Sequence, residues 1–512
     1  MTTTQPMPQP NSDLSAHAVQ EHGNRPGPLT HDEPDEQRRT WTVAAIALVA
    51  QVLVVLDISV VNTALPSIGA DLHLTGAELQ WLVTAYLMMS GGGLLLGGRI
   101  ADLLSRKVVF LVGLAVFTVA SILSGLADTA TQLTLSRAGQ GLAAALLTPA
   151  ALSIISTAYS GRQRRTGLAL WGAVGSLGVA AGVLLGGALT TWLGWQAIFF
   201  INAPIGAAAF IAGISAIPAN APVKELASTT QRAYVSTLRR FDIPGAVTVI
   251  GGLVALIYGL GASGPDGWGS AKVLVALAVS AVLFTAFIRI ENRAAAPLFP
   301  PHTWKVRTLV TGTAVMLAVT GILVGTVFLT SIYLQTVLGF SALQAGLAFL
   351  PFALAITGGT LVARHALAHG SPRAVSMVGL VVTGAGAVLL SRADASSAYG
   401  TGILPALLVI GVGVGAVFVP VSVTAMAGIP PQHAGMASGF LMTGHEVGAA
   451  LGVAVLSAIA TSAGTLTTAG GAANGFTRGL LAAATIAGVA ALLAFWRMPA
   501  TRVTGPVGHM HH

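Results

Sequence analysis

The stretch Leu56-Asp57-Ile58-Ser59-Val60-Val61-Asn62-Thr63-Ala64-Leu65-Pro66 places one acid inside an apolar run that begins at Trp41. A helix of about 20 apolar residues is long enough to cross the hydrocarbon core of a bilayer. A charged side chain at that depth costs about 2.5–3.5 kcal/mol on insertion scales, so such residues are rare and usually functional. The stretch therefore predicts a membrane-spanning helix that carries a functional acid.

The composition of the whole chain agrees with a membrane protein. Of its 512 residues, 54% are hydrophobic and only 8% are charged, whereas soluble proteins carry roughly 25% charged residues. So few charges cannot solvate the surface of a soluble enzyme, a nucleic-acid-binding protein or a disordered chain. The chain has no Cys, which excludes disulfides and thiolate metal sites.

Apolar stretches of spanning length recur along the sequence, and we count fourteen. They cover residues 41–65, 79–98, 108–126, 133–158, 166–191, 197–217, 243–262, 273–290, 309–334, 342–363, 374–390, 400–427, 434–460 and 476–496. The sequence therefore predicts an all-α polytopic membrane protein with fourteen transmembrane helices. Spans seven and eight are the weakest and could form a packed hairpin.

The basic residues predict the orientation of these helices. Of the 25 Lys and Arg, 21 lie in the loops, tails and span ends on the side of the termini, counting Arg289 at the end of the eighth span. Three lie on the opposite side, counting Arg478 at the start of the fourteenth span, and Arg137 lies deep within the fourth span. Because cytoplasmic loops are enriched in Lys and Arg, both termini are predicted to be cytoplasmic. The net charge of +8 is thus a topology signal, and no nucleic-acid partner is expected.

Two short basic connectors indicate an internal repeat. Gly98 to Lys107 follows the second span, and a similar turn-rich segment from Gly359 to Arg373 follows the tenth. If spans seven and eight are an insertion, each copy follows the second helix of a six-helix half. The predicted organisation is a disordered cytoplasmic tail (1–40), a six-helix bundle (41–217), linkers with an inserted transmembrane hairpin (218–307), a second six-helix bundle (308–497) and a tail (498–512).

Three ionisable residues lie clearly at membrane depth, namely Asp57, Arg137 and Glu446. A medium of low polarity favours the neutral form of an acid, so a carboxyl there can carry a proton and, when ionised, can attract a cation. A structural, hydrogen-bonded acid is the alternative. His445 adjoins Glu446, but neighbouring helical residues point about 100° apart, so at most one of the two faces a central cavity squarely.

Polar neighbours extend this list of candidates. A buried Arg137 needs an acid or several carbonyl partners, and Gln140, one turn further on, can share its network. A proton-relay role and a structural role for Arg137 both remain open. Asn62 lies five residues after Asp57, so it is not stacked directly over it.

Gly178, Gly182 and Gly186 recur at intervals of four and form one smooth helical stripe. Small residues at this spacing allow helices to approach closely in lipid. Static packing is one explanation of the stripe, and a surface on which one bundle slides against another is the second.

From Trp41 to Trp496 the chain resembles the major facilitator superfamily, and in particular its fourteen-span drug:proton antiporters. Leu56 to Pro66 is similar to the span 1 signature of that family. The further matches are Gly98, Asp102 and Arg106 for motif A, Arg137, Gln140 and Gly141 for motif B, and Gly182, Gly186 and Gly187 for the antiporter motif, in which Val183 replaces the usual Pro.

The resemblance implies two six-helix bundles that alternate access to a central cavity and drive export with protons. It assigns coupling or cation binding to Asp57 and the tuning of proton traffic to Arg137. Asp102 and Arg106 would hold the cytoplasmic side of the outward-facing state closed.

The resulting hypothesis is a monomeric exporter in the bacterial cytoplasmic membrane that exchanges external protons for hydrophobic, cationic small molecules. The proton gradient supplies the energy, and neither a cofactor nor a metal is expected. The alternatives are a dedicated exporter of one natural product, an uptake symporter and a non-transporting receptor. An enzyme is not expected, because no constellation of nucleophile and base appears.

Overall fold

The computed structural model describes residues 33–159, 161–218, 242–294, 297–299, 303–394, 396–429 and 434–500. Within these ranges the secondary structure is helical throughout, with no strand, so the predicted all-α class is confirmed. Thirteen segments of the described chain are long and apolar enough to cross a membrane, and the two halves of α5, bent by 44°, make a fourteenth.

The first group of helices precedes residue 219. Its members are α1 (Glu33–Asp71), α2 (Gly76–Leu103), α3 (Arg106–Gly125), α4 (Ala130–Ala158), α5 (Gly161–Leu193), the short α6 (Ala197–Phe200) and α7 (Asn202–Ala216). An antiparallel pair follows, formed by α9 (Ile243–Asp266) and α10 (Ala271–Glu291). These are the predicted seventh and eighth spans.

The second group begins after the short helix η2 (Thr303–Lys305). It contains α11 (Arg307–Ile332), the π-helical turn η3 (Tyr333–Val337), α12 (Ala342–His369), α13 (Pro372–Leu390), the π-helical turn η4 (Tyr399–Ile403), α14 (Leu404–Met426), α15 (Ala434–Thr461) and α16 (Ala469–Arg497).

Several helices extend beyond their predicted boundaries, and two of them show why. The tail up to residue 40 was expected to be disordered, but α1 already begins at Glu33, and residues 1–32 lie outside the described part. Helix α12 continues to His369 instead of ending near residue 363. The length of an apolar run indicates only the part of a helix that lies inside the bilayer. Backbone hydrogen bonds continue the helix beyond that run, which explains both differences.

The repeat is visible in how α2 and α12 begin and end. Thr75 before α2 and Ser341 before α12 each form a capping box with the residue three positions on, Glu78 or Gln344. At the other end, two residues separate α2 from α3 and two separate α12 from α13. The two segments that looked alike in sequence therefore occupy the same place in each group.

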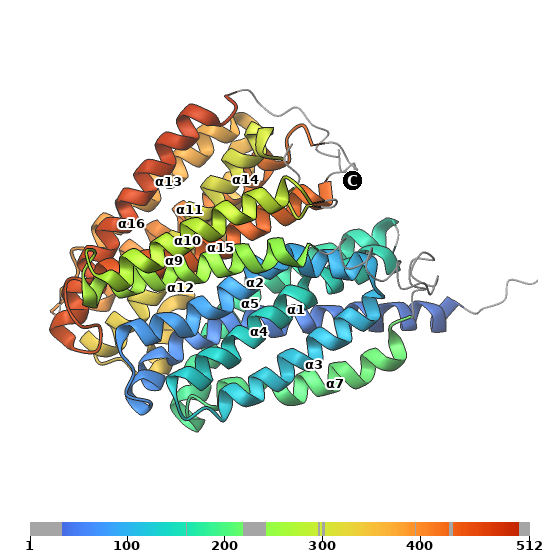
Figure 1. The fold of residues 1–512 in the computed structure, drawn as a ribbon, viewed down its shortest axis with the longest axis horizontal. Coiled ribbons are helices and arrows are strands. Elements are labelled where there is room, and N and C mark those ends of the chain that lie inside the picture. Colours follow the sequence, from blue (N-terminus) through green and yellow to red (C-terminus); the bar gives the residue numbers. More distant parts are fainter. Residues whose placement is uncertain are drawn as a thin grey trace, which may run out of the picture.

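Helices pack most closely within each group and meet across the groups along a few pairs. In the first group α4 packs on α2 and α3, and in the second α14 packs on α12 and α13. Between the groups α2 lies along α15 and α5 along α12, while α9 touches both α2 and α15. The two groups lie close together at the left of Figure 1 and spread apart at the right.

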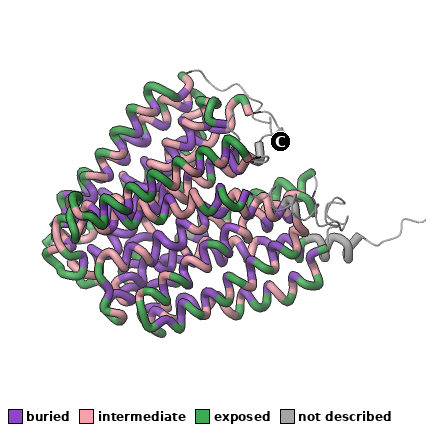
Figure 2. Tube along the Cα trace, viewed as in Figure 1, coloured by how far each residue is buried: buried purple, intermediate pink, exposed green. Residues whose placement is uncertain are grey.

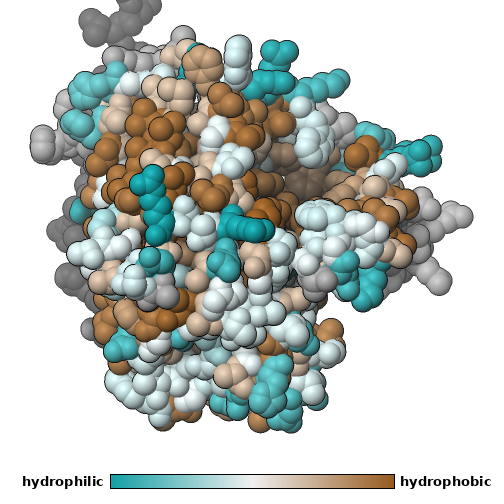
Figure 3. Space-filling view, turned by 90° about the vertical axis from the view of Figure 1, so that its left-hand side faces the viewer, coloured by the Kyte–Doolittle hydropathy of each residue, from teal (hydrophilic) through white to brown (hydrophobic). Residues whose placement is uncertain are grey.

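Burial follows this packing. Buried residues fill the centre of both groups, and exposed residues lie along the outer helix faces (Figure 2). Many of those exposed residues are large and apolar, for example Val112, Leu135 and Leu354, as expected for helices that face lipid. Figure 3 shows the end at the left of Figure 1, where hydrophilic side chains surround apolar surface and a recess lined with apolar side chains.

The glycine stripe of α5 packs against α1. A Cβ on Gly182 would lie 2.6 Å from the Cβ of Ser59, and one on Gly186 would lie 2.5 Å from the Thr63 hydroxyl. Gly178 likewise meets Val55. Because α1 belongs to the same group, the stripe serves close packing within that group. Other residues of α5, among them Val183 and Gly187, meet α12.

Close packing of α14 on α12 makes a stability prediction. A Cβ on Gly415 would overlap the carbonyl oxygen of Ile356, whereas one on Gly358 would meet no atom within 4 Å. Overpacking of this kind costs about 1–3 kcal/mol. We expect Gly415→Ala to lower the melting temperature of the detergent-solubilised protein and Gly358→Ala to leave it unchanged or raise it. Equal effects of both variants would contradict this packing.

Candidate functional site

Asp57 lies in the middle of α1 and is fully buried. One carboxylate oxygen, Oδ2, accepts from the Arg137 guanidinium of α4 in an ion pair. The other, Oδ1, accepts from Gln140 Nε2 at 2.9 Å and from Asn202 Nδ2 at 3.3 Å. Both oxygens of this acid are therefore occupied by donors from α4 and α7.

Arg137 is equally enclosed, with 2% of its surface exposed. Its Nε donates to the Leu82 carbonyl at 3.2 Å, and its Nη1 donates to Gln140 Oε1 at 2.9 Å. The guanidinium carbon lies 4.5 Å from the ring centroid of Tyr86 and 5.9 Å from that of Phe199, within the range of cation–π attraction. Arg137 was predicted to need an acid or carbonyl partners, and it has both, namely the Asp57 carboxylate and the Leu82 carbonyl.

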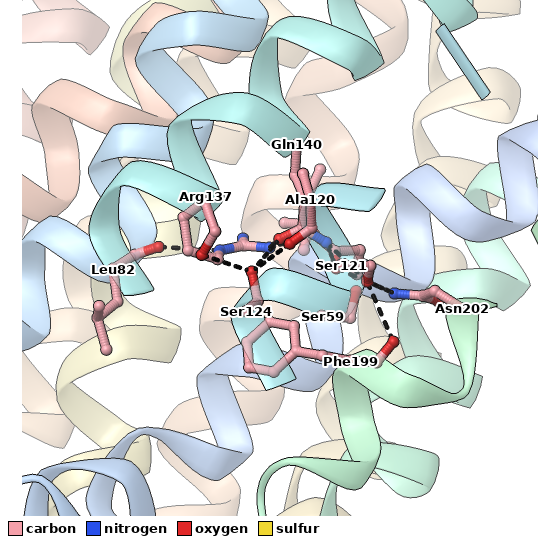
Figure 4. A network of polar contacts seen from close by, with 12 residues as sticks. Ser59, Leu82, Ala120, Ser121, Ser124, Arg137, Gln140, Phe199 and Asn202 are labelled. Carbon is pink, nitrogen blue, oxygen red and sulfur yellow. Dashed lines mark hydrogen bonds and ion pairs between the residues drawn. The ribbon is translucent and has the colours of Figure 1, made fainter. Parts of the chain in front are cut away.

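Serine hydroxyls of α3 complete the network, which Figure 4 shows. Ser121 Oγ accepts from Gln140 Nε2 at 3.0 Å and from Asn202 Nδ2 at 2.9 Å. Ser124 Oγ contacts Ser136 Oγ at 2.9 Å and Gln140 Oε1 at 3.2 Å. Helices α1, α3, α4 and α7 of one group therefore converge on a single buried ion pair.

The two charges of this pair depend on each other. Each would be a buried charge without a partner if the other were lost, and a buried unpaired charge is costly. In the described conformation the pair is closed.

Glu446 lies outside this network, on α15. A Cβ on Gly91 of α2 would be 2.7 Å from the Glu446 Cβ, so the acid lies at the contact between the two groups. Its Oε1 is 3.6 Å from His445 Nδ1, while its Oε2 and His445 Nδ1 have no hydrogen-bond partner among the described atoms. This carboxylate is thus mostly buried but has an unused acceptor.

Tyr86 of α2 packs against the Arg137 guanidinium. Its hydroxyl is buried without a hydrogen-bond partner among the described residues. The close approach of α2 to α4 at this point requires Gly141, because a Cβ there would overlap the Tyr86 carbonyl.

The other predicted site residues lie apart from the ion pair. Asn62 Nδ2 donates to the Ile58 carbonyl of its own helix, and its backbone lies at the contact with α11. Gly98 lies near Pro149 of α4. Arg106 starts α3, and the side chain of Asp102, its expected partner, lies outside the described residues.

Sequence reasoning missed Ser121, Ser124, Tyr86 and Asn202 as site residues. The available signal was their polarity inside apolar spans, which also occurs at many residues that simply hydrogen-bond their own helix.

Among the described residues, no three His, Asp or Glu side chains cluster in a way that could hold a metal ion.

The ion pair makes a prediction for stability. Removing one partner of a buried pair typically costs about 3–5 kcal/mol, because the remaining charge is uncompensated. We expect Arg137→Met to destabilise the protein strongly, and Asp57→Asn combined with Arg137→Met to recover part of the loss, as measured by unfolding in detergent. Additive losses would show that the two side chains do not form a pair.

Comparison with known proteins agrees with the fold. Residues 47–453 match the family model described as Major Facilitator Superfamily. Two solved structures share the fold, namely the nucleoside transporter NupG (TM-score 0.61, 13% identity, covering 89% of this chain and 98% of that one) and a bacterial homolog to the human lysosomal transporter Spinster (TM-score 0.59, 16% identity, covering 89% and 96%).

Relatives of higher identity are named for drug resistance or export. The puromycin resistance protein pur8 of Streptomyces alboniger is 38% identical over 435 residues, covering 84% of this chain and 83% of its own. The cephamycin export protein CmcT of Amycolatopsis lactamdurans is 38% identical (81% and 84% covered), and the multidrug resistance protein Stp of Mycobacterium tuberculosis is 30% identical (80% and 73% covered). The chain therefore belongs to the Major Facilitator Superfamily, among its drug-resistance and antibiotic-export members.

Proposed function

We propose that this protein is a proton-driven exporter of hydrophobic, cationic small molecules in the bacterial cytoplasmic membrane. The observation that carries the proposal is the contrast between its two acids at membrane depth. Asp57 is fully hydrogen-bonded and ion-paired, whereas Glu446 has an acceptor oxygen without a partner at the contact between the helix groups. The names of the relatives support export as the direction.

In this proposal the two acids have different roles, and Glu446 is the site of exchange. Ionised Glu446 attracts a cationic substrate, because a carboxylate with an unused acceptor oxygen in a region of low dielectric constant gains most from a positive partner. A proton taken from outside then neutralises Glu446 and releases the cation outward. After the protein returns to the inward-facing conformation, the proton leaves to the cytoplasm and the carboxylate is ready for the next cation.

The Asp57–Arg137 pair sets the conformation in which this exchange occurs. Separating Asp57 from Arg137 requires a new partner for the guanidinium. The aromatic rings and serines around the pair change position only when α1, α3, α4 and α7 repack. Asp57 thus couples the protonation cycle to the movement of a helix group. The proton gradient is the proposed energy source, with no organic cofactor and no metal, and a single chain contains every group named here.

A dedicated exporter of one natural product is the second candidate. Two relatives carry the name of a single compound, puromycin or cephamycin, and a third is named for multidrug resistance. A panel of competing substrates distinguishes a narrow from a broad specificity. An uptake symporter would instead accumulate substrate on the same side as the protons, so the direction of flux separates it from both exporters.

Transport in proteoliposomes tests the roles of the two acids. With ethidium and puromycin as probes and an imposed pH gradient, we expect wild-type protein to move a probe against the direction of proton flow. Asp57→Asn and Glu446→Gln should each reduce gradient-driven transport at least tenfold. Asp266→Asn is the matched control, because this acid is paired with Lys272 at a partly exposed position and should transport normally.

Each acid has its own contradicting result. Intact gradient-driven transport by Asp57→Asn would rule out its coupling role, and intact transport by Glu446→Gln would rule out its role as the exchange site. Transport of the probes in the same direction as protons would overturn export itself.

A further inference from the structure

Pro66 leaves a carbonyl of α1 without its usual helical partner. It lies inside α1, five residues before the helix ends, and proline has no backbone N–H. In a helix the N–H of residue 66 would donate to the carbonyl of residue 62. The carbonyl oxygen of Asn62 is therefore free to accept a hydrogen bond from outside the helix.

A side chain of the other helix group supplies that hydrogen bond. Ser331, at the end of α11, donates from Oγ to the Asn62 carbonyl at 2.5 Å. Gln335 Nε2 donates to the next carbonyl, that of Thr63, at 3.0 Å. Gln335 Nε2 also lies 3.2 Å from Ser331 Oγ, so the two donors support each other.

These bonds lie where the two groups meet at the ends opposite to the predicted cytoplasmic side. Gln335 belongs to the π-helical turn η3 (Tyr333–Val337), and π-turns occur frequently at functional sites. At the same end, the backbone N–H of Leu343 in α12 donates to Thr191 Oγ1 of α5 at 3.1 Å. The outer ends of the groups are thus joined by side-chain hydrogen bonds.

We propose that Ser331 and Gln335 are positioning residues for alternating access, which hold the outer ends closed by bonding the carbonyl that Pro66 frees and the one beside it. The inference rests on the proposed transport function. When the outer ends separate, these donors leave and water replaces them at the α1 carbonyls. Pro66 thereby gives α1 a binding group that is satisfied within the protein only in the closed state.

The same helix carries Asp57, nine residues before Pro66. A movement of α1 that accompanies repacking around the Asp57–Arg137 pair also moves the Asn62 and Thr63 carbonyls away from α11. Closure outside and the state of the ion pair are therefore linked through one helix.

Spin-label distances measure the outer closure directly. The natural sequence has no Cys, so cysteines at Ala70 and Gly470, both exposed at the outer ends of α1 and α16, give specific labels on the two groups. The full-length protein in lipid nanodiscs yields the ratio of open to closed populations by double electron–electron resonance. This readout needs no transported substrate. It therefore distinguishes failure of the proposed outer closure by Ser331 and Gln335 from failure of the proposed transport function.

A double-mutant cycle provides the decisive comparison. Loss of one hydrogen bond shifts an equilibrium by about threefold to tenfold, so Ser331→Ala should raise the open-to-closed ratio by that factor. Pro66→Ala restores an N–H for the Asn62 carbonyl, and in that background Ser331→Ala should change the ratio less than twofold. Thr330→Val is the matched control, since the Thr330 hydroxyl is buried without a partner among the described residues, and it should leave the ratio unchanged.

Two results would overturn the inference. One is an unchanged ratio in Ser331→Ala, and the other is an equal shift by Ser331→Ala in the presence and absence of Pro66. If Pro66→Ala does not fold, Gln335→Met replaces it as the second test. Removal of its amide should raise the open-to-closed ratio in the same direction, and an unchanged ratio in Gln335→Met would also overturn the inference.

Discussion

A buried charge pair in a bilayer must be neutralised from within the protein, and the first helix group is organised around this constraint. Asp57 and Arg137 are removed from water, so each donor and acceptor that water would have offered must come from a neighbouring helix. Gln140, Asn202 and the Leu82 carbonyl supply them directly, and Ser121 holds the two amides in place. Glycines at the helix contacts allow these short side chains to reach one another.

Helix α1 connects this network to the contact between the groups. Its central part carries Asp57, and its outer part carries the carbonyls that bond Ser331 and Gln335 of the second group. Glu446 lies on a different contact, between α15 and α2. The carboxylate that exchanges ligands and the ion pair that responds to it are therefore separate in space, but both lie beside α2. Such a separation lets one carboxylate alternate between proton and cation while the buried pair remains protected from solvent.

Much of the architecture is predictable because its signals are local. Each transmembrane helix is an apolar run of sufficient length, and the need of Arg137 for an acid follows from its depth alone. The site is less predictable, because Asp57 and Asn202 are 145 residues apart and their proximity depends on how four helices pack. Asn62 illustrates the same limit. Its position five residues after Asp57 indicated that it is not stacked directly over the acid. Its backbone carbonyl makes the contact across the groups, which a pattern of side chains does not reveal.

The central claim is that Glu446 exchanges a proton for a cationic substrate, and that the Asp57–Arg137 pair couples this exchange to the repacking of the first helix group. Proton release on ligand binding tests this most directly, by adding ethidium to weakly buffered, detergent-solubilised protein and recording the change in pH. The account predicts that wild-type protein releases protons when it binds ethidium and that Glu446→Gln binds ethidium more weakly without releasing them. Proton release by Glu446→Gln equal to that of wild type would contradict the account.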